Sequence, residues 1–121
     1  MRRMPRSVLI VDDHAGFRAS ARAILEADGF EVVGEAANGT EATEAIERLG
    51  PEIVVLDVQL PDMTGFDVCE RCLPEGRSAP AIVLVSSRDA EEYGHLIVES
   101  GARGFVAKAD LSGEALLELL G

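Results

Sequence analysis

A run of four apolar residues, 53–56, stands near the middle of the chain and ends in a single carboxylate, Asp57. An unbroken run that is mostly β-branched predicts a short strand buried on both faces. Pro61 and Gly65 predict a loop after it. Ligands of open α/β sheets bind at the carboxyl ends of the strands. Asp57 is therefore either a helix cap or a functional group placed at such an edge.

The same unit, a short apolar strand followed by a helix, recurs five times along the chain. The predicted strands cover residues 7–11, 31–36, 53–58, 81–85 and 104–108. Helical stripes of apolar residues run over 17–25, in a helix that Gly29 ends, and over 42–49 and 66–73, and two further helices are predicted over 89–100 and 111–120. Such alternation predicts an α/β fold, a parallel sheet with helices on both faces, because right-handed crossovers place the helices there.

The composition limits the classes of protein to which the chain can belong. Its 121 residues, 47% of them apolar and 27% charged, predict one globular domain. The net charge of −11 disfavours binding to nucleic acid or to an anionic membrane, since both select basic residues. It is compatible with a cation site or a basic partner.

The N-terminus and the cysteines indicate where the protein works. We expect residues 1–6, which are basic, to form a disordered lead. Only four apolar residues, 8–11, follow before Asp12, too few for a signal peptide or a membrane span. Two cysteines, Cys69 and Cys72, make no disulfide framework. We therefore expect a cytoplasmic protein with reduced thiols.

Polar residues follow four of the predicted strands: Asp12-Asp13, Asp57, Ser86-Ser87 and Lys108. The carboxyl ends of parallel strands share one edge, so these groups can converge. Two carboxylates about 4 Å apart repel by about 4 kcal/mol at an effective dielectric near 20. Three of them together raise a pKa or recruit a cation, and Mg²⁺ accepts such oxygen ligands and serves phosphoryl groups.

Each of these residues also has a simpler interpretation. One aspartate of the pair can cap a helix that begins near His14, and Ser86 can cap the next one. Lys108 can be a surface lysine, and His14 either flanks the site or lies on the surface. The conjunction of all the groups at successive strand ends favours a site.

The chain resembles the receiver domains of two-component response regulators over nearly its whole length. Four segments carry the resemblance: Val11-Asp12-Asp13, residues 56–65 (LDVQLPDMTG), Val85-Ser86-Ser87 and residues 104–108 (GFVAK). The resemblance implies a flavodoxin-like (βα)5 fold, a doubly wound parallel sheet of strand order 2-1-3-4-5, over residues 7–121. Residues 108–110 (KAD) are similar to those of receivers attached to LuxR-type helix-turn-helix outputs.

The resemblance also implies a phosphorylation-dependent signalling switch. Asp57 is then the phosphoacceptor, which takes its phosphoryl group from a sensor histidine kinase or a phosphotransfer protein. Such a protein is not an enzyme in the ordinary sense, since it catalyses only its own phosphorylation and dephosphorylation. The roles implied for the other residues are Mg²⁺ binding by Asp12, Asp13, Asp57 and the Gln59 carbonyl, phosphoryl binding by Lys108 and Ser86, and switching by Ser86 and Phe105.

Some features depart from this pattern or suggest rivals. Many receivers have proline after the lysine, often with a cis bond, and Ala109 stands there instead. The Cys69-x-x-Cys72 pair suggests redox chemistry, but it lies inside a predicted helix, where one thiol is expected in the core and the other partly exposed. No phosphate-binding glycine motif supports a nucleotide enzyme. A receiver-like interaction module without phosphorylation remains an alternative.

The last predicted helix, from Leu111 to Leu120, is apolar over more than one face. An apolar surface larger than one core needs indicates a contact site. We expect a second copy of the chain or an effector domain to bind it. Both a stand-alone receiver and the excised front of a DNA-binding transcription regulator are compatible with this sequence.

Overall fold

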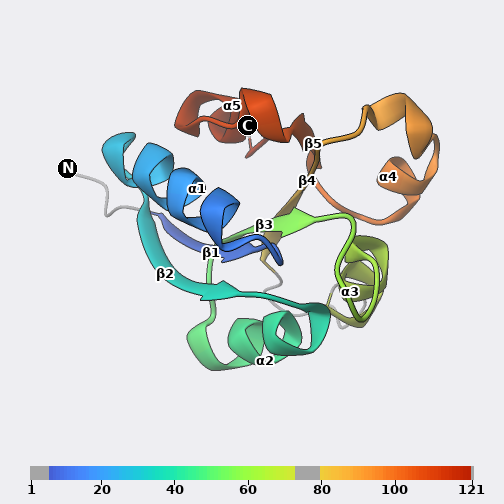
Figure 1. Ribbon diagram of the computed structural model, residues 1–121, viewed down its shortest axis with the longest axis horizontal. Coiled ribbons are helices and arrows are strands. Elements are labelled where there is room, and N and C mark those ends of the chain that lie inside the picture. Colours follow the sequence, from blue (N-terminus) through green and yellow to red (C-terminus); the bar gives the residue numbers. More distant parts are fainter. Residues whose placement is uncertain (1–5, 73–79, 121) are drawn as a thin grey trace.

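The computed structural model describes residues 6–72 and 80–120 (Figure 1). The strands are β1 (Ser7–Val11), β2 (Glu31–Ala36), β3 (Ile53–Asp57), β4 (Ala81–Ser86) and β5 (Gly104–Ala107). The α-helices are α1 (Ala15–Ala27), α2 (Gly39–Leu49), α3 (Gly65–Cys72), α4 (Leu96–Glu99) and α5 (Gly113–Leu120). Two 3-10 turns, η1 (Ala90–Glu92) and η2 (Lys108–Asp110), flank α4 and β5.

The five strands form one parallel sheet in the order β2-β1-β3-β4-β5. This order confirms the expected flavodoxin-like topology. The chain winds outward from β1 in both directions, so α1 and α5 cover one face and α2 and α3 the other (Figure 1). All five residues of the central strand β3 are buried, as its apolar run predicts.

Side chains alternate along the inner strands and build a separate core on each face. Val8 and Ile10 of β1 pack with Leu25 of α1 and Leu116 of α5. Leu9 and Val11 belong to the other core, which contains Ala42 and Ala45 of α2 and Val68 and Cys69 of α3. The sheet thus buries apolar side chains on both faces. Ligands of parallel sheets bind at the carboxyl ends of the strands.

The predicted continuous helix over 89–100 is wrong. Residues 90–92 form a single 3-10 turn, and Gly94 then adopts a left-handed φ of 55°. Only four residues, Leu96–Glu99, are α-helical, and none of them is buried. A residue in the left-handed region interrupts the helical hydrogen bonds, and glycine adopts it without steric strain. Leu96 and Val98 consequently face solvent.

The ends of other elements also differ from the sequence-based boundaries. The prediction that the last helix begins at Leu111 is wrong, because Leu111 is extended and buried in the core. Helix α5 begins at Gly113, where the Ser112 hydroxyl accepts a hydrogen bond from the Ala115 amide. The strands predicted to reach residues 58 and 108 end one residue earlier.

Some predictions fall partly outside the described residues. Residues 1–5 of the predicted lead and the last residue of the helix predicted over 66–73 lie there. Within the described ranges no peptide bond is cis, so the Lys108–Ala109 bond is trans. In the same ranges no helix has the length and apolar character that crossing a membrane requires.

Candidate functional site

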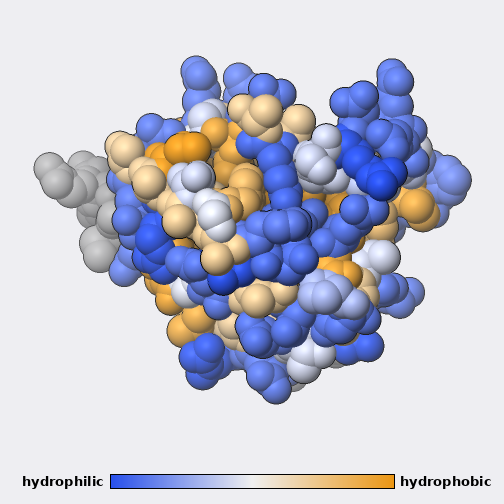
Figure 2. All heavy atoms as spheres, in the orientation of Figure 1, coloured by the Kyte–Doolittle hydropathy of each residue, from blue (hydrophilic) through white to orange (hydrophobic). Residues whose placement is uncertain are grey.

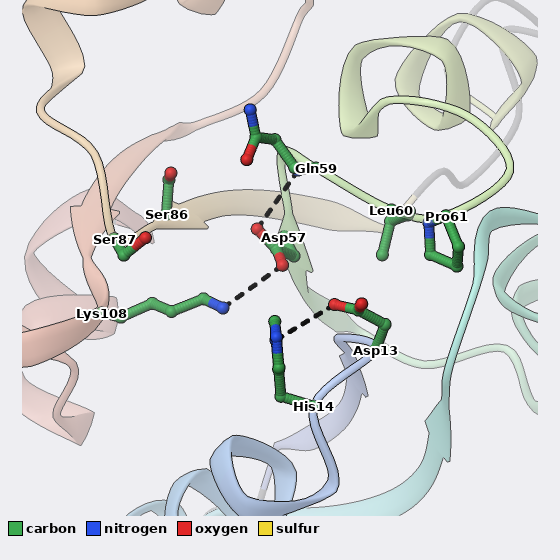
Figure 3. A pocket seen from close by; sticks show the side chains of 9 residues that line it. All are labelled: Asp13, His14, Asp57, Gln59, Leu60, Pro61, Ser86, Ser87 and Lys108. Carbon is green, nitrogen blue, oxygen red and sulfur yellow. Dashed lines mark hydrogen bonds and ion pairs between the residues drawn. The ribbon is translucent and has the colours of Figure 1, made fainter.

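A pocket of about 250 Å³ opens at the carboxyl edge of the sheet (Figure 3). It lies where β1, β3 and β4 end and where β5 passes into η2. The residues that line it are Asp13, His14, Asp57, Gln59, Leu60, Pro61, Ser86, Ser87 and Lys108. The structure thus brings together the polar groups that the sequence places at four separate strand ends.

The loop after β3 passes close to Asp57 because of Gly65. A Cβ atom at Gly65 would lie 2.6 Å from the carbonyl oxygen of Asp57, closer than real Cβ contacts. The Gly65 amide donates to the Val58 carbonyl at 2.7 Å, and Gln59 forms an isolated bridge with Thr64. Glycine at this position therefore lets the loop fold back tightly and form one wall of the pocket.

Lys108 reaches from η2 to the carboxylates at the centre of the site. Its Nζ lies 2.5 Å from Oδ2 of Asp12 and 3.2 Å from Oδ2 of Asp57. It also lies 4.6 Å from the centre of the Phe17 ring, a cation–π contact from α1. The Lys108 side chain is only 17% exposed. The alternative interpretation of Lys108 as a surface lysine is therefore wrong.

Burial and mutual repulsion perturb the pKa values of the two inner carboxylates. Burial and the charge of Asp12 raise the pKa of Asp57 to about 6, although Lys108 and the Gln59 amide act against them. Burial also acts to raise the pKa of Asp12, but the ammonium group of Lys108 and the hydrogen bond from the His14 amide outweigh it and lower that pKa. One lysine thus faces two buried carboxylates, and the site keeps a net negative charge.

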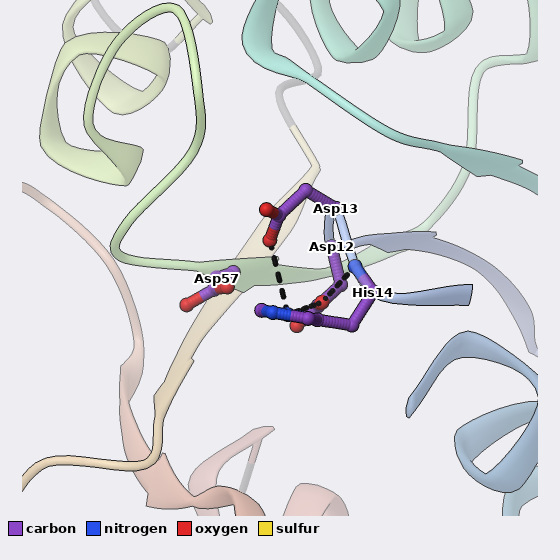
Figure 4. Close-up of side chains that lie close together, drawn as sticks. All are labelled: Asp12, Asp13, His14 and Asp57. Carbon is purple, nitrogen blue, oxygen red and sulfur yellow. Dashed lines mark hydrogen bonds and ion pairs between the residues drawn. The ribbon is translucent and has the colours of Figure 1, made fainter. Parts of the chain in front are cut away.

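The acidic groups fit a hard cation. Asp12, Asp13, His14 and Asp57 each offer a ligand atom within 4.8 Å of the others (Figure 4). The buried Oδ2 of Asp12 has no well-aligned hydrogen bond among the described residues and is compensated by the ion pair with Lys108 alone. A polar atom buried in this way is costly unless it is paired. Oxygen ligands and an open mouth suit Mg²⁺, which keeps several of its waters.

Asp12 and Asp13 are not side-chain caps of α1. Asp12 lies outside the helix and accepts the His14 amide at 2.7 Å through Oδ1. Helix α1 begins at Ala15, and its N-cap residue is His14, whose side chain makes no capping hydrogen bond. Nδ1 of His14 lies 3.1 Å from a carboxylate oxygen of each aspartate, while the imidazole stays exposed. His14 thus flanks the site and lies on the surface at once.

Of three further residues expected at the site, only Gln59 contacts Asp57, whereas Ser86 and Phe105 contact Tyr93. The Gln59 amide donates to Oδ1 of Asp57 at 3.2 Å. Ser86 is buried at the end of β4, but its side chain does not point at Asp57 (Figure 3). Its Oγ instead lies 2.8 Å from the hydroxyl of Tyr93 and accepts the Arg88 amide. Phe105 is half-buried on β5, next to Tyr93.

The sequence analysis missed Tyr93 and the contact of Phe17 with Lys108. Phe17 belongs to the apolar stripe of the first predicted helix, and this helical pattern contains no sign of the lysine, which follows 91 residues later in the chain. Tyr93 lies in the segment wrongly predicted as a regular helix. No motif marks it, since its approach to Ser86 depends on the turn at 90–94.

The cysteine pair does not form a redox site. Cys69 is buried and Cys72 half-buried, both free, as expected for a core helix. Burial raises the pKa of the Cys69 thiol to about 12 and also raises that of Cys72. Reactive cysteines require a lowered pKa.

Comparison with known proteins identifies the family. The model of the response regulator receiver domain matches residues 8–120. The nitrate/nitrite response regulator protein NarP of Escherichia coli is 37% identical over 117 residues, which cover 96% of this chain and 54% of NarP. The chemotaxis protein CheY of Thermotoga maritima is 35% identical over 105 residues, 87% of each chain. The chain thus spans about half the length of NarP and most of CheY.

A solved structure agrees with these sequence relatives. The DNA-binding response regulator of the LuxR family from Staphylococcus aureus superposes with a TM-score of 0.81 at 26% identity, over 95% of both chains. The strand order, the acidic pocket and the matched family model all lead to the same conclusion. The chain belongs to the response regulator receiver domains of two-component systems.

Proposed function

We propose that this chain is a phosphorylation-dependent signalling switch in which Asp57 accepts the phosphoryl group. The observation that carries the proposal is the placement of Asp57 in the pocket, with Nζ of Lys108 3.2 Å from its Oδ2 and two further aspartates beside it. The donor is a phosphohistidine of a sensor histidine kinase or a phosphotransfer protein. The chain takes up one phosphoryl group and does not turn over an external substrate.

The transfer exchanges one bond to phosphorus for another. An oxygen of the Asp57 carboxylate attacks the phosphorus, the P–N bond to the donor imidazole breaks, and the imidazole nitrogen keeps the electron pair and takes up a proton. Asp57 is ready for this role at neutral pH, because a pKa of about 6 leaves most of its carboxyl groups ionised. Lys108 forms an ion pair with the attacking carboxylate of Asp57. After the transfer its ammonium group can form an ion pair with a phosphoryl oxygen instead.

Asp12, Asp13, Asp57 and the Gln59 carbonyl are the groups that would hold Mg²⁺. When bound, the ion offsets negative charge on the transferring group and on the carboxylates that face it. The buried Oδ2 of Asp12 supports this assignment, since the ion pair with Lys108 is its single compensation among the described residues. The excess of acidic over basic groups in the pocket supports it as well.

Ser86 and Phe105 are proposed to transmit the phosphorylated state. The Ser86 hydroxyl can donate to a phosphoryl oxygen, and Phe105 can move into the space that Ser86 leaves. The half-buried position of Phe105 supports this role, because a fully packed ring has no second arrangement. Phosphorylation then changes the surface that partners read.

Helix α5 is the proposed contact surface for a second copy or an effector. Leu116 is buried, whereas Leu117 is 50% exposed. Ile24 of α1 is also partly exposed, and Figure 2 shows apolar atoms on the surface over α1 and α5. NarP and the LuxR-family relative support a DNA-binding output, carried by another domain because this one has a charge of −11. CheY supports a stand-alone receiver.

The test is the mass of the intact protein after incubation with phosphoramidate, with and without Mg²⁺. We expect a Mg²⁺-dependent gain of one phosphoryl group that Asp57→Asn abolishes. Asp89→Asn is the matched control, because Asp89 is exposed and its side chain caps no helix; it should be phosphorylated like the wild type. An equal gain in Asp57→Asn would refute the acceptor assignment. No gain in the wild type would favour an interaction module without phosphorylation.

A further inference from the structure

The Ser86 hydroxyl is already engaged by two residues that do not line the pocket. Its Oγ lies 2.8 Å from the Tyr93 hydroxyl, and it accepts a hydrogen bond from the Arg88 amide at 3.0 Å. Ser86 itself is buried, at 2% exposure. A serine hydroxyl carries a single proton. Either hydroxyl can be the donor in the contact with Tyr93. In both cases the Ser86 side chain lies toward Tyr93 and must turn away from it to donate its proton to a group on Asp57.

The Tyr93 ring is held in place by aromatic neighbours from two other elements. Its centroid lies 5.8 Å from that of Phe66 on α3, in an edge-to-face arrangement, and 6.0 Å from that of Phe105 on β5. Such packing fixes the ring and aims its hydroxyl at Ser86. Phe105 has no hydroxyl, so the hydrogen bond to Ser86 comes from the η1–α4 segment instead of from β5.

Tyr93 also anchors the segment that contains it. Among residues 90–99, Tyr93 and Ile97 are the hydrophobic residues that pack against the core. The rest of the segment is loosely attached: Gly94 has a left-handed φ, α4 has four residues, and Val98 is 81% exposed. A segment with so few buried contacts belongs to the least stable parts of a fold. A change in the contacts of Tyr93 therefore readily shifts the whole segment 90–99.

We propose that Tyr93 is a positioning residue that holds the Ser86 hydroxyl away from Asp57 until a phosphoryl group competes for it. This inference rests on the proposed function of Asp57. When Ser86 turns toward the phosphoryl oxygen, Tyr93 loses its partner and the segment 90–99 rearranges. The exposed side chains of Leu96 and Val98 move with this segment, so the protein surface differs between the phosphorylated and the unphosphorylated chain.

The chain provides its own probe for this exchange. Tyr93 is its single tyrosine and it has no tryptophan, so the near-ultraviolet phenol band and the fluorescence report on Tyr93 alone. Phosphoramidate with Mg²⁺ should change the wild-type signal, and the unphosphorylated Ser86→Ala variant should show the same change. Mg²⁺ alone and the Ser87→Ala variant, which removes a neighbouring hydroxyl, should leave it as it was. A phosphorylated wild type with an unchanged phenol signal would overturn the inference but leave the proposed function intact.

Rates provide a second, independent test. Tyr93→Phe keeps the ring and removes the hydroxyl, so it should accelerate phosphoryl uptake roughly twofold to tenfold, the worth of one hydrogen bond. In a Ser86→Ala background the same substitution should have no effect, whereas a general structural role of Tyr93 would act in both backgrounds. Equal effects in the two backgrounds would refute competition for Ser86. Absence of any mass gain in the wild type would instead refute the proposed function.

Discussion

Replacing Asp57 by asparagine should stabilise the fold at neutral pH when divalent cations are absent. The folded chain holds Asp57 buried beside Asp12, with one lysine shared between them. The asparagine side chain has nearly the same shape, and its single oxygen still accepts one of the two hydrogen bonds that Lys108 and the Gln59 amide donate to Asp57. It no longer repels Asp12, and Lys108 can then compensate Asp12 fully.

The size of this effect follows from the pKa of Asp57, which burial and the charge of Asp12 raise from 3.8 to about 6. A difference of about 2 in pKa corresponds to about 3 kcal/mol in the free energy of unfolding. The side chain is only 6% exposed, so solvent screening reduces this little. The destabilisation by Asp57 is absent below pH 3.8, where the residue is protonated in the folded and in the unfolded chain. It is complete above pH 6, where the residue is ionised in both. It should be roughly half as large at pH 5.

Urea unfolding with a chelator, followed by circular dichroism at pH 7.5 and pH 5, measures this difference. Asp57→Asn should exceed the wild type by roughly 3 kcal/mol at the higher pH and by roughly half of that at the lower. The control Asp89→Asn removes the same charge from an exposed position and should stay within about 0.5 kcal/mol of the wild type. Added Mg²⁺ should stabilise the wild type more than Asp57→Asn and narrow the gap. A less stable Asp57→Asn, or a gain independent of pH, would refute the assigned repulsion.

Three further substitutions test other parts of the structure. Lys108→Ala leaves the buried Asp12 carboxylate without its cation and should destabilise the fold by about 3–5 kcal/mol in chelator, with partial recovery in Mg²⁺; urea unfolding without any loss would contradict the ion pair. Gly65→Ala places a methyl group 2.6 Å from the Asp57 carbonyl, so it should lower both the melting temperature and phosphoryl uptake. Normal uptake would mean that the loop tolerates the side chain. Leu116→Ala opens a cavity under α5 and should cost about 2–5 kcal/mol in denaturant unfolding, against less than 1 kcal/mol for the exposed Leu117→Ala.

The fold could be predicted in nearly all of its outline. Runs such as 53–56 have too many consecutive apolar residues for a half-exposed strand, and their alternation with helical patterns leaves little choice but a parallel sheet. The prediction failed at 89–100, where local pattern suggested one helix and Gly94 turned out to be left-handed. The spacing of apolar residues does not reveal whether a glycine will be used as a hinge or tolerated within a helix.

The site could be predicted as a set of residues but not as a set of contacts. Each polar group at a strand end could be named because parallel strands end at one edge, a rule that needs no tertiary coordinates. The sharing of Lys108 between Asp12 and Asp57 could not be foreseen, since it depends on the reach of a flexible side chain across three strands. The same holds for the raised pKa of Asp57, which results from burial and from the exact distance to its neighbours.

By itself the sequence determined the strand–helix alternation, the two-faced core and the identity of the acidic residues at the sheet edge, because these follow from local periodicity and from the order of residues along the chain. Only the tertiary structure decided where the Ser86 hydroxyl points and that Tyr93 is its partner. Hydrogen bonds between side chains are set by angles and distances of a few tenths of an ångström, which depend on how whole elements pack. Residue type and spacing carry no record of that packing.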